Sequence, residues 1–114
     1  MAMDRSLIPA VRDVVERLVR REFARLEADG RSGRLTAEEL ARALDDYGRT
    51  LVDVPDDGWE LADSYEIEGR PGAWAIDLPL WTKEEGRSDL TLSLSTSRGD
   101  DDEVVVEIDD IQVP

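Results

Sequence analysis

The sequence predicts an α+β fold, in which two N-terminal helices pack on one face of a four-stranded antiparallel meander sheet. Apolar residues in the first third of the chain recur every three to four positions, as in an amphipathic helix. Between positions 74 and 108 they alternate instead with polar residues, as in strands that bury one face. The alternation is clearest at 90–94, where Leu90, Leu92 and Leu94 are separated by Thr91 and Ser93.

The chain has the length of one domain. Its 114 residues lie near the common domain size, and no low-complexity linker or internal repeat divides them. We therefore expect a single domain over 1–114, with a helical half at 6–48 and a sheet half at 60–113.

The helical half contains two periodic segments. In the first, which Gly30 and Gly33 end, Ser6 is the expected N-cap and Pro9 lies in the first turn, where proline is tolerated. The second begins at Thr36, because Thr36 and Glu39 have the spacing of a capping box, and ends at Gly48.

The sheet half contains four apolar segments separated by turns. A turn or short helix is expected at Pro55, followed by a first strand around 61–67 and a second at 74–80 that Pro79 distorts. The third strand is 90–94. The fourth follows the turn at 99–102 and places Val104, Val106 and Ile108 inward.

The apolar alternation of the last strand slips by one residue, to Ile111 and Val113. Asp109 and Asp110 lie at the slip, which predicts a β-bulge that redirects the final residues. Such a bulge would turn one of the two carboxylates toward the end of the sheet.

Charge is the strongest compositional signal. Asp and Glu number 28 against 14 Lys and Arg, a net charge of −14, and 22 of the acids follow residue 34. Such a field repels phosphate backbones and anionic lipids, so we expect neither nucleic-acid nor membrane binding. It attracts a basic protein surface, although the same charge also serves solubility.

Several chemistries lack their residues. The chain has no Cys and no His, which excludes disulfides, thiolate nucleophiles, imidazole ligands and a Ser–His–Asp triad. No phosphate-binding or nucleophile-elbow motif occurs. We therefore expect no catalytic residue, cofactor or metal. No apolar run has the length of a signal peptide or membrane span, so the expected location is the cytoplasm.

Two acidic segments have alternative interpretations. The stretch 28–40, ADGRSGRLTAEEL, resembles an EF-hand calcium loop, with Glu39 at the twelfth position. Ala28 and Gly30, however, stand where side-chain oxygens are needed, so a helical connection with a capping box is favoured. The run 100–103 is interpreted as a solvated hairpin tip, because consecutive side chains on a strand point apart.

A charged loop leads into the third strand and provides the candidate interaction residues. We expect this loop to lie at one end of the sheet, near the bulged acids, with Arg87 paired to Asp89 or Asp110. Trp81 either covers the sheet edge or anchors a partner. The candidate rim consists of Trp81, Thr82, Glu84, Glu85, Arg87, Ser88, Asp89, Asp109 and Asp110.

Two segments carry a family resemblance. LWTKEEGRSDLTLSL at 80–94 and VVEIDDIQV at 105–113 resemble an uncharacterised bacterial domain family, with an LWT-x-EEGRSDLTL segment and a final paired-Asp strand. The likeness extends from Val14 onward and implies no particular activity. The order of helices followed by a meander is also similar to NTF2-like and cystatin-like domains. NTF2-like domains usually curl their sheet around a pocket, and their enzymes often use His or Asp there.

Two functions fit these observations. The first is a non-enzymatic interaction module, of immunity or adaptor type, that binds a basic partner through its acidic sheet and the rim. The second is a small-ligand or enzymatic NTF2-like domain, with a pocket between the first helix and the sheet near Trp74, Tyr65 or Asp110. Its oligomeric state stays open.

Overall fold

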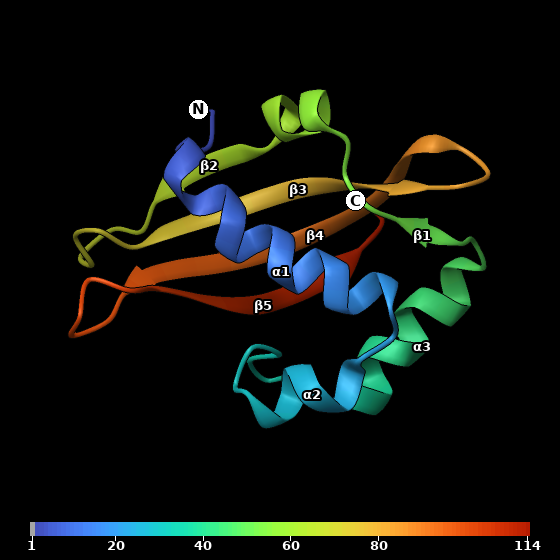
Figure 1. Cartoon of the computed structure of the whole chain (residues 1–114), viewed down its shortest axis with the longest axis horizontal. Coiled ribbons are helices and arrows are strands. Elements are labelled where there is room, and N and C mark those ends of the chain that lie inside the picture. Colours follow the sequence, from blue (N-terminus) through green and yellow to red (C-terminus); the bar gives the residue numbers. More distant parts are fainter. Residues whose placement is uncertain (1) are drawn as a thin grey trace.

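An antiparallel five-stranded sheet forms one layer of the molecule, and helix α1 crosses its front (Figure 1). The structure is a computed structural model that describes residues 2–114. It confirms the α+β fold. The strand order is β1-β3-β4-β5, with β2 also paired to β3. Within residues 2–114, no helix is both long and apolar enough to cross a bilayer.

The helical elements, in chain order, are the 3-10 turn η1 (Arg5–Leu7), α1 (Ile8–Val19), α2 (Phe23–Ala28), α3 (Ala37–Tyr47) and the 3-10 turn η2 (Asp56–Leu61). The strands are β1 (Leu51–Val52), β2 (Asp63–Glu66), β3 (Trp74–Thr82), β4 (Gly86–Arg98) and β5 (Val104–Gln112).

The first predicted helix is divided in two. Arg21 adopts a positive φ of 60°, so the chain turns between α1 and α2 well before Gly30. One tertiary and one local contact hold this unfavourable backbone: the Arg21 guanidinium donates to Asp45 at 2.7 Å and lies 5.0 Å from the ring centroid of nearby Phe23. Figure 1 shows the consequence, because α1 stays on the sheet whereas α2 and α3 lie beside β5.

The caps agree with the sequence at α3 and differ at α1. Thr36 and Glu39 form the predicted capping box, and Gly48 ends α3 in the left-handed conformation. The prediction that Ser6 is the N-cap of the first helix is wrong. Asp4 caps the preceding turn instead, by accepting from the Ser6 N–H at 2.9 Å.

The predicted meander is present as β2-β3-β4-β5, but the third strand, predicted at 90–94, is longer as β4 (Gly86–Arg98) and includes part of the charged loop. The strand expected around 61–67 is shorter, because Leu61 belongs to η2, and the two-residue strand β1 was not predicted. Pro79 lies in β3 between the stretches that pair with β2 and with β1. Proline has no N–H to offer a neighbouring strand there, and the β3–β4 register shifts just beyond it, as expected.

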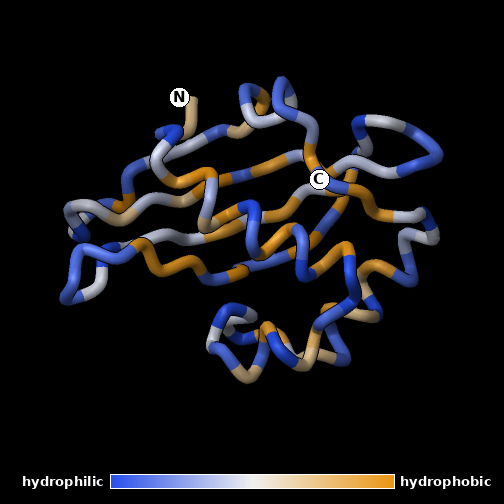
Figure 2. Tube along the Cα trace, in the orientation of Figure 1, coloured by the Kyte–Doolittle hydropathy of each residue, from blue (hydrophilic) through white to orange (hydrophobic). Residues whose placement is uncertain are grey.

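The core lies between α1 and the sheet. From α1, the side chains of Val11, Val14, Val15 and Leu18 are almost fully buried, as are the inward-facing residues of β3, β4 and β5. Figure 2 shows apolar residues where α1 crosses the strands and polar residues in the hairpins at both ends. The space between helix and sheet is thus filled by side chains.

The loop between α2 and α3, whose sequence resembles a calcium loop, covers part of the exposed edge of β5. The Ile108 N–H donates to the Arg31 carbonyl oxygen at 2.7 Å. Gly33 has a φ of +61°, and a Cβ there would clash with the Ile108 carbonyl oxygen. Glu39, at the twelfth position of the calcium-loop pattern, accepts from Thr36 N–H in the capping box. The segment therefore serves as a strand cover and helix start.

Gly33→Ala should displace this loop. The left-handed backbone alone costs an alanine about 1–2 kcal/mol, and the clash with Ile108 should add about 1–3 kcal/mol. Gly30→Ala is the matched control, because Gly30 has a φ of +72° but nothing within 4 Å of a Cβ. Urea unfolding of both variants measures the difference. Equal losses of stability would show that the loop does not pack against β5.

Candidate functional site

The β3–β4 hairpin carries most of the predicted rim, and its turn is held by its own side chains. Thr82 is buried, and its Oγ1 accepts from the Glu85 N–H at 3.1 Å and donates to the Glu85 carboxylate at 3.1 Å. Gly86 closes the turn with a φ of +73°. The turn geometry thus follows from residues within the hairpin.

Glu84 fastens the hairpin to the segment after α3. Its two carboxylate oxygens accept from the N–H and the hydroxyl of Thr50, each at 2.8 Å. The Lys83 N–H donates to the Thr50 carbonyl oxygen, also at 2.8 Å. Because both Thr50 donors favour the ionised form, the pKa of Glu84 is lowered from its ordinary value.

Tyr47 makes a second connection between the hairpin and α3. Its hydroxyl donates to the Glu85 carboxylate at 2.8 Å and accepts from the Asp89 N–H at 3.3 Å. Desolvation and the hydrogen bond to Glu85 raise the pKa of the Tyr47 hydroxyl. We call the contacts of Tyr47 and Thr50 with Glu84, Glu85 and Asp89 the hairpin latch.

Ser88 stabilises an irregularity in the sheet. The register shift next to Pro79 leaves backbone groups without a regular ladder partner. The buried Ser88 hydroxyl donates to the Leu80 carbonyl oxygen at 2.8 Å and accepts from the Leu90 N–H at 3.1 Å. The Ser88 hydroxyl is thus hydrogen-bonded within the sheet and has a structural role.

Trp81 covers the 3-10 turn η2. A Cβ at Gly58 would lie 2.8 Å from the Trp81 ring and 2.8 Å from Val54, so the indole packs directly on the η2 backbone. Of the two interpretations of Trp81, this contact favours the cover over the partner anchor.

Arg87 does not form the predicted ion pair. Within the described residues it pairs with neither Asp89 nor Asp110, so the prediction is wrong. Arg87 and Asp89 instead line an open hollow of about 480 Å³, together with Val113 at the chain end. For Asp110 the reason is distance along the sheet, since Asp110 pairs with Ser93, which lies six residues beyond Arg87 in β4.

The predicted bulge at Asp109 and Asp110 is confirmed. Ile108 pairs with Leu94 and Ile111 with Leu92, so both aspartates oppose Ser93. Asp109 accepts a short hydrogen bond from the Ser95 hydroxyl, on the face of the sheet away from α1. Asp110 turns the other way and lines a hollow beside α3. Beyond the bulge Ile111 is buried, whereas Val113 is 55% exposed.

The residues named for a ligand pocket lie apart. Tyr65 is 52% exposed on the open face of the sheet, Asp110 borders α3, and Trp74 lines a hollow with Ala2 and Asp4 at the N-terminus. In residues 2–114, no three His, Cys, Asp or Glu side chains gather in a group that could hold a metal ion.

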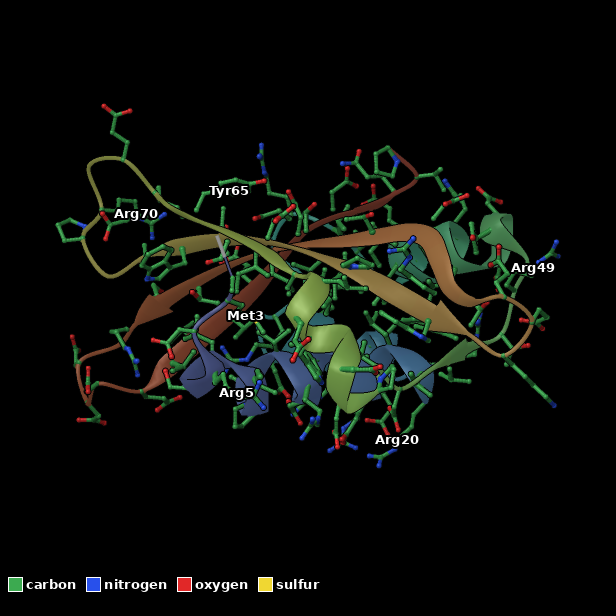
Figure 3. All side chains as sticks on the ribbon, turned by 90° about the horizontal axis from the view of Figure 1, so that it is seen from above. Met3, Arg5, Arg20, Arg49, Tyr65 and Arg70 are labelled. Atoms are coloured by element: carbon green, nitrogen blue, oxygen red, sulfur yellow. The ribbon has the colours of Figure 1, made fainter. Side chains whose placement is uncertain are left out.

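The open face of the sheet, which the alternation in the sequence predicts to be polar, is the feature that best distinguishes the surface. The residues between the buried positions of β2–β5 share this face, and Figure 3 shows Tyr65 on the side opposite Arg5 and Arg20. It carries Asp63, Tyr65, Ala75, Asp77, Pro79, Arg87, Asp89, Thr91, Ser93, Ser95, Ser97, Val105, Glu107 and Asp109. The alternation that located the strands also identifies these residues.

Comparison with known protein families finds a match over most of the chain. The model of a family described as a domain of unknown function (DUF7668) matches residues 15–114. No curated protein and no solved structure is significantly similar to the chain.

Tyr47→Phe should loosen the hairpin latch. The variant keeps the ring and removes the hydroxyl that joins Glu85 to Asp89, which should lower the free energy of unfolding by about 1 kcal/mol. The Asp89 amide should also exchange faster with solvent. Tyr65→Phe is the control, since an exposed substitution should change stability by less than about 0.5 kcal/mol. If the two variants are equally stable, the latch contributes nothing.

Proposed function

The chain belongs to this family of domains of unknown function, and we propose that it is a non-enzymatic interaction module that binds a basic protein partner through the open face of its sheet. Under this proposal it acts as an adaptor or immunity-type protein in a bacterial cytoplasm. The observation that carries the proposal is the distribution of charge in the folded molecule.

The carboxylates of the sheet half have no cationic partners within the described residues. All the ion pairs among the described residues join side chains within residues 12–56, before the sheet half begins. Residues 57–114 carry sixteen Asp and Glu against four Lys and Arg. An uncompensated field of this kind speeds encounter with a cationic surface and disfavours anionic ones.

The open face presents these charges in an ordered arrangement. Asp77 accepts from the Ser93 hydroxyl at 2.8 Å, and Asp109 accepts from the Ser95 hydroxyl. A carboxylate that accepts one hydrogen bond from a serine hydroxyl still has free acceptor sites for an arginine or lysine of a partner. Within the described residues neither Asp77 nor Asp109 forms an ion pair, although Arg70 lines the same hollow as Asp109.

Tyr65 adds an aromatic contact to this acidic face. It lies opposite Ala75 in the β2–β3 ladder and is 52% exposed. The small Ala75 leaves the ring accessible. Tyrosine is one of the residue types that most often contribute binding energy at protein interfaces.

The test is affinity purification of the tagged chain from its source cells. We expect a retained protein that is basic and that raised ionic strength releases. The double variant Asp63→Lys and Asp89→Lys reverses two charges on the open face and should lose this partner.

The matched control is Asp53→Lys with Glu60→Lys, which makes the same change in net charge at exposed positions outside the sheet face. It should retain the partner. Retained proteins that are acidic, retention that resists salt, or equal loss in both double variants would contradict binding through the open face.

A further inference from the structure

A groove runs between α3 and the end of β5. Two adjoining hollows of about 230 Å³ and 310 Å³ share Ala43 and Asp46 of α3 and Ile111 of β5. Its floor is apolar, because the second hollow also contacts Leu90 and the exposed Val113.

The wall of the groove is acidic. Glu39 and Asp46 project from α3, and Asp110 projects from the bulge of β5. The one cation in the lining, Arg42, donates to Glu38 at 3.2 Å, outside the groove. An apolar floor beneath carboxylates is complementary to a segment that combines apolar and basic side chains.

The β5 edge in this groove offers backbone groups to such a segment. The Ile108 N–H points away from β4, toward the free edge of the sheet, where it donates to the Arg31 carbonyl oxygen. Ile108 and Ile111 oppose Leu94 and Leu92, which have the same orientation in β4, so the Ile111 N–H also points to the open edge. There it donates to the Asp110 carboxylate at 2.9 Å, in place of a neighbouring strand.

We propose that this groove binds an extended segment of a basic protein, with alternating basic and apolar residues, as an added strand beside Asp110–Gln112. A carbonyl oxygen of the segment accepts the Ile111 N–H, which frees the Asp110 carboxylate for a lysine or arginine of the same segment. Apolar residues of the segment cover Ala43 and Val113. The inference rests on the proposed function and adds a second contact site to it.

A second copy of the chain is the less suitable occupant. Each copy carries a net charge of −14, so pairing two β5 edges would bring Asp110 and the other groove carboxylates of both copies together. Charge complementarity therefore selects a basic partner.

The probe is a synthetic alternating Lys-Val peptide of about seven residues, the length of an ordinary strand, compared with its Glu-Val counterpart. The Lys-Val peptide should bind the full chain in calorimetry, and its counterpart should not. Binding should slow amide exchange of Ile111 about tenfold and leave Ile108, which is already paired to Arg31, unchanged.

Two variants and one control distinguish binding in the groove from nonspecific attraction of the peptide to an acidic protein. Asp46→Lys should weaken peptide binding about tenfold, whereas Asp53→Lys, the same charge change outside the groove, should not. Ala43→Leu keeps the charge and a good helix former but fills the floor, and should also weaken binding.

Three results would overturn the groove proposal: no peptide binding, equal weakening by Asp46→Lys and Asp53→Lys, or an Ile111 amide exchange rate that is the same in the free chain and in the complex. The open-face proposal is tested by different variants, Asp63→Lys with Asp89→Lys, so the two proposals can fail separately. A shift to dimers on sedimentation, without the peptide, would also count against this occupant.

Discussion

The structure depends on burial of a single face of the β3–β4 ribbon beneath α1. Leu78 and Leu92, neighbours across the two strands, are fully buried in the same core cluster as the valines of α1. Because side chains alternate along a strand, burying one set places Asp77 and Ser93 on the opposite face. The packing of the core therefore decides which side chains form the acidic open face.

The fold assigns a structural role to the charged side chains of the β3–β4 hairpin. Glu84 and Glu85 looked like groups displayed to a partner, yet both are hydrogen-bonded to Thr50 and Tyr47. They hold the end of the sheet against α3, and thereby set the position of α3 beside β5. Among the rim residues, Arg87 and Asp89 keep exposed side chains that the latch does not use.

The sequence predicted what is encoded in short-range patterns. Alternation located β3 and β4, the spacing of Thr36 and Glu39 located the start of α3, and the phase slip at Asp109 located the bulge. The break at Arg21 was missed, because its left-handed backbone is held by a contact with a residue far along the chain. The latch was missed for the same reason, since its partners are more than thirty residues apart.

The central claim is that the β4 side chains divide into a core set and a surface set. Urea unfolding of two neighbouring variants tests it most directly. Leu92→Ala should lower the free energy of unfolding by about 2–5 kcal/mol, and Thr91→Ala by less than about 1 kcal/mol. Similar losses for the two variants would contradict a sheet with one dry and one solvated face.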